Sequence, residues 1–327
     1  MLNYSDIHKN QKNEIITNAK PFLKWVGGKT QLLNEISILY PFGMKINKYI
    51  EPFVGGGAVL FNILNTYEWF LNDVFISDIN ADLINCYAVV RDKVDNLIKS
   101  LSKYETTFLS LNTEERTEFY NKKRKRFNAI KTRYSVKEKN DCIIYHKNNN
   151  YSKYQVEAAA LLIFLNKTCY NGLYRENSNG EFNTPIGKYE KPEICDITNL
   201  YACSKKLQGV FICACDFETA LSFASKDCFV YLDPPYRPIS DTSSFTSYAN
   251  VPFNDEEQKR LSECVHRLSD RASQFVLSNS DPHNTDVNDD FFDDLYSEFS
   301  IKRVQAGRAI NSNADKRGKV SELLIYN

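Results

Sequence analysis

Short apolar runs alternate with segments of helical periodicity along much of the chain. The helical segments repeat apolar side chains every three or four positions, and they cover residues 31–39, 58–65, 81–91 and 255–268. The apolar runs have the length of buried strands, and they cover residues 48–53, 74–77, 210–213, 229–232, 274–278, 301–304 and 322–326. This alternation predicts an α/β fold with a doubly wound, mostly parallel sheet and helices on both faces. The last two strands are expected to add an antiparallel edge.

The middle third of the chain interrupts the alternation because it is mainly helical. Its last helix, residues 156–165, is apolar, and Gly172 lies beyond its end. Residues 173–175 and 181–184 flank Asn177-Ser178-Asn179-Gly180, which is a strong turn signal for a β-hairpin. A two-stranded ribbon is narrow enough to enter the major groove of DNA. We therefore expect residues 92–190 to form a domain inserted into an α/β domain made of residues 1–91 and 191–327.

Composition is that of an ordinary globular protein. The 327 residues are 43% hydrophobic, and 41 Lys and Arg balance 41 Asp and Glu, which provides enough apolar side chains for a large core. The apolar runs are shorter than the ~20 residues of a membrane span, and the N-terminus is polar, so we expect a cytoplasmic protein without a membrane partner. Nine scattered cysteines without a C-x-x-C pair, and only four histidines, argue against disulfides and a zinc site. No metal is expected.

The balanced net charge conceals an uneven distribution. Residues 92–190 carry 18 Lys and Arg against 12 Asp and Glu, a net charge of +6, and the rest of the chain carries −6. Within this basic third, Lys122-Lys123-Arg124-Lys125-Arg126 begins a Lys/Asn-rich stretch that extends to Lys153. Such a run is typical of nucleic-acid contact, and a solvated helix face explains it equally well.

The first candidate ligand site is a glycine turn between a strand and a helix, Gly55-Gly56-Gly57. Glycines let the backbone approach a ligand closely, and the amides that begin the next helix can face that ligand. Asp78 follows Gly57 by 21 residues, at the end of the next predicted strand, where a carboxylate can accept both hydroxyls of a ribose. Leu60 stands where the dinucleotide fingerprint requires glycine, which disfavours a nicotinamide cofactor. A plain strand-to-helix turn is the alternative.

The second candidate is Asp233-Pro234-Pro235-Tyr236, directly after an apolar strand. Prolines fix the backbone and carry no N–H, so the Asp233 carboxylate and the Pro234 carbonyl present acceptors only, which suits an amino group with two hydrogens. Tyr236 can stack on the planar molecule that bears this amine. A stiff structural loop is the alternative.

A third segment lies just ahead of the first predicted helix and contains Phe22, Trp25, Gly27, Gly28 and Lys29. Its lysine and the helix N-terminus could hold a carboxylate. The segment lacks the G-x-x-x-x-G-K-[ST] spacing of nucleoside triphosphate sites, and by itself it is also compatible with an N-terminal lid.

Taken together, these segments resemble the Dam-like family of DNA adenine-N6 methyltransferases, in the order of its alpha class, over nearly the whole chain. The matching residues are 22–29, 51–57, 77–80, 171–175 with 180–185, 233–236, 245–248 and 317–324. The resemblance implies a Rossmann-like methyltransferase fold, S-adenosyl-L-methionine as cofactor and double-stranded DNA as partner. It also implies that residues 92–190 are a mainly helical target-recognition domain that ends in the hairpin.

The resemblance also assigns roles to individual residues. The implied catalytic residues are Asp233, Pro234, Pro235 and Tyr236. The implied cofactor contacts are Trp25, Lys29, Phe53, Gly55, Gly57, Asp78, Asp216, Phe217 and Asp233. The implied DNA contacts are Lys24, Tyr170, Asn171, Leu173, Arg175 and Pro185, and the basic run adds Lys122 and Lys123 as expected phosphate contacts. Two features depart from the family pattern: a longer stretch before Asp78 that contains a rival acid, Asp73, and the basic segment itself.

The expected reaction is direct methyl transfer to adenine N6, within GATC, after the base has been flipped out of the duplex. Three alternatives keep the same enzyme class, with cytosine N4, a protein glutamine amide or a longer adenine-containing site as the target. An inactive DNA-binding relative and, least favoured, a small-molecule dehydrogenase are the others. A restriction endonuclease of the same system is an expected partner without a stable complex, and the protein is expected on the nucleoid through DNA.

Overall fold

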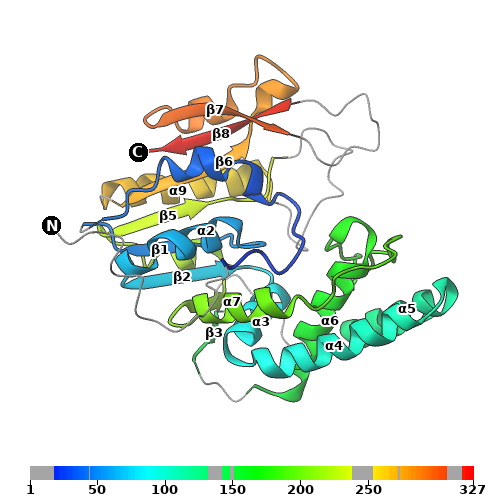
Figure 1. Cartoon of the computed structure of the whole chain (residues 1–327). Coiled ribbons are helices and arrows are strands. Elements are labelled where there is room, and N and C mark those ends of the chain that lie inside the picture. Colours follow the sequence, from blue (N-terminus) through cyan, green and yellow to red (C-terminus); the bar gives the residue numbers. More distant parts are fainter. Residues whose placement is uncertain are drawn as a thin grey trace.

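The computed structural model describes residues 18–43, 45–131, 142–147, 151–237, 253–271, 273–307 and 319–327. Its centre is an eight-stranded sheet in the order β3-β4-β2-β1-β5-β6-β8-β7 (Figure 1). The strands are β1 Lys48–Glu51, β2 Asp73–Asp78, β3 Ile143–Tyr145, β4 Phe211–Ala214, β5 Cys228–Leu232, β6 Gln274–Ser280, β7 Ser300–Gly307 and β8 Lys319–Tyr326. The five central strands are parallel, whereas β3 pairs antiparallel with β4 at one edge and β8 pairs antiparallel with β6 and β7 at the other.

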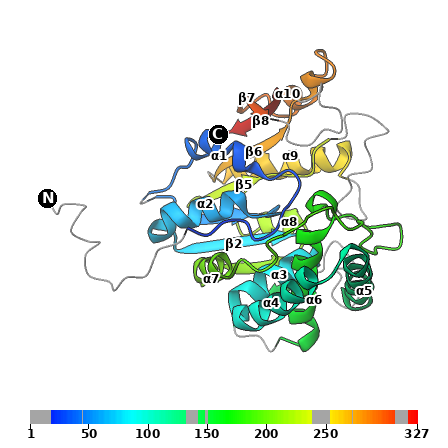
Figure 2. The same ribbon diagram turned by 45° about the vertical axis from the view of Figure 1, so that its right-hand side comes forward.

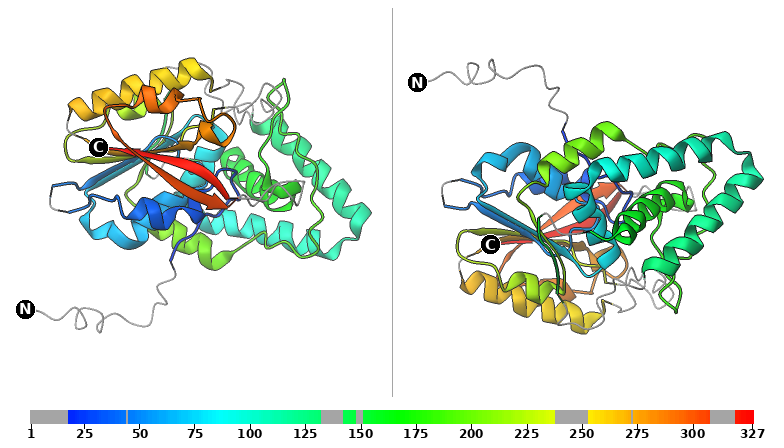
Figure 3. Two further views of the ribbon diagram at one scale, coloured as in Figure 1. Left: turned by 90° about the horizontal axis from the view of Figure 1, so that it is seen from above. Right: turned by 90° about the horizontal axis from the view of Figure 1, so that it is seen from below.

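Helices cover both faces of this sheet (Figure 3). One face carries α1 Leu33–Ser37, α2 Ala58–Tyr67, α3 Ala81–Asp92 and α7 Ile197–Lys206. The other carries α8 Phe217–Leu221, α9 Asp255–Asp270 and α10 Phe291–Leu295. Short 3₁₀ turns lie at η1 Lys29–Gln31, η2 Glu68–Phe70, η3 Tyr170–Gly172 and η5 Pro282–Asn284.

Strand β5 shows why the central strands read as continuous apolar runs. All five of its residues are buried, because helices pack on both faces of a parallel sheet. Its side chains alternate between the two faces, so that Tyr231 joins one core whereas Val230 and Leu232 join the other. Strands β1 and β5 pair in parallel, with Ile50 opposite Val230. The segments that follow these two strands therefore leave the sheet side by side at its carboxyl edge.

Three further helices lie beside the sheet: α4 Val94–Ser110, α5 Thr113–Lys131 and α6 Lys153–Thr168. They form a bundle next to α3, and α5 projects away from the sheet (Figures 1 and 2). Helix α6 begins at a capping box in which Ser152 and Gln155 exchange side-chain and backbone hydrogen bonds. It is buried from Ala158 to Asn166, which explains its apolar sequence.

The predicted mixed α/β fold, with a mostly parallel sheet and an antiparallel edge from the last two strands, is confirmed. Two predicted elements differ in detail. The helix over residues 31–39 is a 3₁₀ turn followed by the short α1, and the strand over residues 48–53 ends at Glu51, ahead of Pro52, which has no N–H for a ladder. The insertion of residues 92–190 as a separate domain stays a prediction.

The turn at Asn177–Gly180 forms as predicted, but its flanks do not make regular strands. Antiparallel bridges join Glu176 to Phe182 and Cys169 to Ile186, and the Asn183 amide donates to the Arg175 carbonyl at 2.9 Å. We call residues 170–187 the hairpin segment. Residues 245–248 and 317–318, which contribute to the family resemblance, lie outside the described residues. Within the described residues, no helix has the length and apolar character to cross a bilayer.

Candidate active site

The glycine turn requires glycine at two positions where the backbone is left-handed. Gly55 has φ +47° and Gly57 has φ +76°, and Gly57 immediately precedes α2. A Cβ at Gly57 would lie 2.5 Å from the Tyr87 hydroxyl oxygen. Tyr87 in turn donates to the Gly55 carbonyl at 2.9 Å. Tyr87 of α3 thus holds the turn in place, and it leaves no room for a residue larger than glycine at position 57.

Asp78 ends β2 directly beside this turn. Its Oδ2 accepts from the Gly55 amide at 3.2 Å, and its Oδ1 accepts from the Asn80 amide at 2.9 Å. Burial raises the pKa of Asp78 to about 6. The rival acid Asp73 begins β2 at the opposite end, near Lys48, so it cannot take the place of Asp78.

Asp233 follows β5 and meets Lys29 from the N-terminal segment. Lys29 Nζ lies 2.7 Å from Asp233 Oδ1 and donates to the Gly27 carbonyl at 3.0 Å. Ser278 of β6 also donates to Asp233 Oδ1, at 3.1 Å. Burial raises the pKa of Asp233, and the Lys29 ammonium opposes that rise. Because both contacts fall on Oδ1, Oδ2 is the carboxylate oxygen that remains to accept a hydrogen from a ligand.

Tyr236 lies over the same lysine and is fixed at its hydroxyl. Lys29 Nζ is 4.7 Å from the centre of the Tyr236 ring, and the Tyr236 hydroxyl donates to Glu322 Oε2 of β8 at 2.6 Å. Burial and the neighbouring carboxylates raise the pKa of Tyr236 well above its usual range, so the phenol keeps its proton at neutral pH.

A cavity of about 470 Å³ joins these elements. Its lining includes Trp25, Lys29, Gly56, Tyr236 and Glu322. The volume falls in the range of about 300–1,000 Å³ that is usual for small-molecule sites. Gly56 and Tyr236, which are far apart in the sequence, therefore border one ligand-sized space, whereas Asp78 and Asp233 are not among the lining residues.

A second aromatic group lies next to the carboxyl end of β4. The rings of Phe53 and Phe217 are 5.4 Å apart. Asp216 caps α8 and receives two hydrogen bonds at 2.8 Å from the Arg260 guanidinium. That guanidinium also lies 3.9 Å above the Phe217 ring. Arg260 of α9 thus fixes the orientation of Asp216 and Phe217 together.

The N-terminal segment also touches the hairpin segment. The Asn166 amide bonds to both the backbone N–H and the carbonyl of Lys24, at 2.8 and 2.7 Å, and to the Gly172 carbonyl at 2.9 Å. Trp25 stacks on Tyr174, with ring centres 5.5 Å apart. Lys24 is exposed, and its ammonium lies 4.2 Å above the Tyr189 ring.

The other residues with expected DNA roles lie on the accessible side of the hairpin segment. Tyr170, Asn171, Arg175 and Pro185 are exposed, and Leu173 is half-buried. Asn171 has φ +54°, which turns the chain between α6 and the hairpin. Arg175 Nε donates to Asn183 Oδ1 at 2.7 Å.

The basic run on α5 is less uniform than its sequence. Lys122 and Lys125 are exposed. Lys123 is half-buried with its ammonium 4.0 Å above the Tyr104 ring, and this burial lowers its pKa. Arg126 makes two hydrogen bonds of 2.7 Å to Glu157. The run therefore presents fewer free charges than its five residues suggest.

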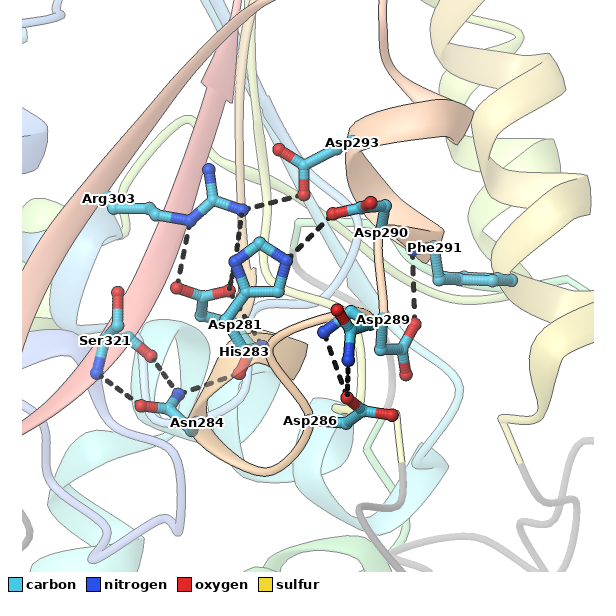
Figure 4. Close-up of polar contacts among 11 residues, drawn as sticks. Asp281, His283, Asn284, Asp286, Asp289, Asp290, Phe291, Asp293, Arg303 and Ser321 are labelled. Atoms are coloured by element: carbon cyan, nitrogen blue, oxygen red, sulfur yellow. Dashed lines mark hydrogen bonds and ion pairs between the residues drawn. The ribbon is translucent and has the colours of Figure 1, made fainter.

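Two groups of side chains in the described part of the chain have the composition of a metal site. One consists of Cys142, Cys213 and Cys215. The other, His283, Asp290 and Asp293, follows β6 (Figure 4). In the second group, Arg303 donates to Asp281 at 3.1 Å and to Asp293 at 2.7 Å (Figure 4), so a fixed guanidinium already supplies the positive charge.

The sequence did not reveal three residues that hold the site together: Glu322, Ser278 and Arg260. Glu322 belongs to a segment that carries the family resemblance, but nothing in its spacing indicated a contact with Tyr236. Asn284 supports the strand that bears Glu322, because it bonds to both the backbone N–H and the carbonyl of Ser321, at 2.9 and 2.7 Å (Figure 4). Such partners come from strands and helices that are distant along the chain, and only the fold brings them together.

Comparison with known proteins identifies a family and several relatives. Residues 25–310 match the family described as D12 class N6 adenine-specific DNA methyltransferase. The Type II methyltransferase M.MjaIII of Methanocaldococcus jannaschii is 49% identical over 313 residues, which cover 94% of this chain and 99% of that protein. The DNA adenine methylase of Haemophilus influenzae is 33% identical, over 93% of this chain and 92% of that protein. The DNA adenine methylase of Escherichia coli K12 is 32% identical, over 93% of this chain and 94% of that protein.

Proposed function

This chain belongs to the D12 class of N6 adenine-specific DNA methyltransferases, and we propose that it methylates adenine N6 within GATC in duplex DNA, with S-adenosyl-L-methionine as donor. The observation that carries the proposal is the shared cavity, in which Lys29 and Tyr236 face Gly56 while Lys29 Nζ contacts Asp233 Oδ1 at 2.7 Å. A stacking ring and the glycine turn thus border one space, and the Asp233 carboxylate is held next to it by a lysine of the lining.

Residues at the carboxyl ends of the neighbouring strands fit the proposed cofactor, although they are not among those that line the cavity. Asp78 is anchored by two backbone amides, and its carboxylate has further lone pairs to accept ribose hydroxyls. The Phe53 and Phe217 rings offer an apolar surface for a purine. When bound, S-adenosyl-L-methionine would supply an activated methyl group as a sulfonium.

The chain's own task is to prepare the target amine. The lone pair of adenine N6 is delocalised into the purine, so the nitrogen is a weak nucleophile while it is planar. Asp233 Oδ2 and the Pro234 carbonyl would accept its two hydrogens and favour the tetrahedral nitrogen of the transition state over the planar ground state. Tyr236 would stack on the extruded base, which offsets part of the few kcal/mol that base flipping costs.

Target recognition is proposed for the hairpin segment, with residues 92–190 as the recognition domain. Arg175 would make a two-pronged contact to guanine O6 and N7. Its Nε donates to Asn183 Oδ1, which fixes the guanidinium, so the two terminal nitrogens would donate to the guanine. Tyr170, Asn171, Leu173, Pro185 and Lys24 would contact the same site. A cognate endonuclease in a restriction pair is part of the proposal.

The direct test is methylation of a plasmid by the full chain, followed by single-molecule sequencing of modified adenines. We expect modification at every GATC and none with Asp233→Ala. Modification at a different or longer site would disprove the GATC assignment, and methylation of cytosine would disprove the target base.

Arg175→Ala should relax the choice of site. Losing one two-pronged guanine contact costs about 1–3 kcal/mol, or roughly 5- to 150-fold in discrimination. The ratio of kcat/KM on GATC to that on single-base variants measures this, and Lys188→Ala, another exposed cation after the hairpin, is the matched control. An equal loss on cognate and variant duplexes would contradict the role of Arg175.

A further inference from the structure

Three thiols converge where β3 joins the main sheet. Cys142 directly precedes β3, Cys213 lies in β4, and Cys215 directly follows β4. Their sulfur atoms all lie within 4.8 Å of one another, and Cys142 Sγ is 2.7 Å from Cys213 Sγ. Of the cysteines that the structure describes, no other three come this close.

Strand register explains the convergence. Ile143 pairs with Ala214 and Ile144 pairs with Cys213 in the antiparallel ladder, which brings Cys142 opposite Cys215. Side chains alternate between the faces of a sheet, so Cys213 and Cys215 share one face. Those two are buried beside Ala220 and Phe75, whereas Cys142 is exposed and gives solvent a route to the group.

We propose that Cys142, Cys213 and Cys215 bind one thiophilic metal ion, of the class of Zn²⁺ or Cu⁺. Three thiolates are the ligands that such ions prefer, and solvent on the Cys142 side can complete the four-coordinate geometry of Zn²⁺. Binding is an exchange without electron transfer, in which each metal–sulfur bond replaces a thiol proton that passes to the buffer. A disulfide between Cys142 and Cys213 would use two sulfurs and leave the third without a role.

The thiols do not share one acidity: the hydrogen bond between Cys213 and Cys215 lowers the pKa of Cys215 and raises that of Cys213, and burial raises the pKa of Cys142. The proposal therefore rests on the convergence of the three sulfur atoms. The site also borders the catalytic sheet edge, since the Cys215 amide donates to the Asp78 carbonyl at 3.3 Å. The proposal does not rest on the proposed function, because none of the three thiols is among the proposed cofactor or DNA contacts.

The test is titration of the full, reduced chain with Cd²⁺ as the probe ion. We expect an ultraviolet thiolate-to-cadmium charge-transfer absorption that saturates at one ion per chain and is displaced by Zn²⁺. Cys142→Ser, at an exposed position, should lower the Cd²⁺ affinity by at least about 100-fold, the upper end of what loss of a supporting group costs a metal site. Cys195→Ser, whose sulfur contacts Ser102 outside the group, is the matched control and should leave the affinity unchanged.

Three results would overturn the proposal. One is the absence of a saturable one-to-one absorption in the wild-type chain. Another is equal affinity in the wild type and in both Cys142→Ser and Cys213→Ala, with circular dichroism confirming that the variants are folded. The third is a disulfide between Cys142 and Cys213, seen as two fewer free thiols than the nine cysteines of the sequence and as a peptide in which these two residues are covalently joined.

Discussion

The position of Tyr236 depends on a residue 86 positions away in the sequence. Glu322 accepts the tyrosine hydroxyl at 2.6 Å, and the backbone of the preceding residue, Ser321, is held by Asn284. The ring on which the target base is proposed to stack is thereby fixed at its far end. Glu322 is a positioning residue for Tyr236.

Glu322→Ala should lower kcat/KM about 10- to 100-fold, because a hydrogen bond to a charged acceptor is worth about 1.5–3 kcal/mol. Glu322→Gln keeps an acceptor oxygen and should retain most of the activity. Fluorescence of 2-aminopurine at the target position reports the stacking of the flipped base directly. Tyr236→Phe removes the donor of the same hydrogen bond. The double variant Glu322→Ala with Tyr236→Phe should therefore lose no more kcat/KM than either single variant. Losses of kcat/KM that multiply would contradict the pairing.

Cofactor affinity should fall in acid because of Asp78. The raised pKa of about 6 means that this carboxyl takes up a proton as pH falls through 6, well before an ordinary aspartate. If only the ionised form binds, the affinity for S-adenosyl-L-methionine falls about tenfold for each pH unit below that value. Calorimetric titration between pH 5 and pH 8 measures the profile.

Two variants identify the titrating group. Asp78→Asn should bind weakly and without this pH dependence. Asp82, whose pKa is also raised to about 6, contacts Lys131 instead of the glycine turn, so Asp82→Asn should keep the wild-type profile. The reverse pattern would remove Asp78 from the cofactor site.

At the scale of elements, the basic run on α5 contains an exposed lysine, Lys122, and a half-buried one, Lys123. Lys122→Ala should weaken binding to cognate and non-cognate duplexes alike and reduce the slope of log K against log salt by about 0.9, the value for one phosphate contact. Lys123→Ala should instead act mainly on stability, because its ammonium lies over the Tyr104 and Phe119 rings. Lys99→Ala, an exposed lysine on α4, controls for the loss of charge. Equal slopes for the Lys122 and Lys99 variants would remove Lys122 from the DNA surface.

The elements that the sequence predicts best are those whose signal is local. Strand β5 is recognisable because burial on both faces makes it apolar throughout, and the glycine turn because left-handed backbone demands glycine. Strand β3 was missed because its three residues lie within the Lys/Asn-rich stretch and gain a partner only from β4. Ser278 and Arg260 were missed for the same reason, since a polar residue in a strand or helix does not indicate which distant carboxylate it contacts.

At the scale of the whole molecule, Lys131 joins parts of the chain that are far apart. Its ammonium donates to the Tyr174 hydroxyl at 3.1 Å and the Gly180 carbonyl at 2.8 Å, forms an ion pair with Glu176 and lies 3.5 Å from Asp82 of α3. The lysine is only 6% exposed. The end of α5, the hairpin segment and α3 therefore share one buried charge network.

Lys131→Met should lower the free energy of unfolding by about 3–5 kcal/mol, because it leaves buried carboxylates without their cation. Urea unfolding followed by circular dichroism measures the loss. The double variant Lys131→Met with Glu176→Gln also removes one of the unpaired carboxylates, so it should recover part of the lost free energy of unfolding. A loss below about 1 kcal/mol, the value of an exposed pair, would show that the network is solvated.

The stacking of Trp25 on Tyr174 gives the molecule an internal optical probe. The chain has two tryptophans, and the other, Trp69, is 73% exposed on η2. A Trp69→Phe chain would emit from the single indole that touches both the glycine turn and the hairpin segment. Changes at either of these two segments could then be timed by fluorescence without attaching a dye.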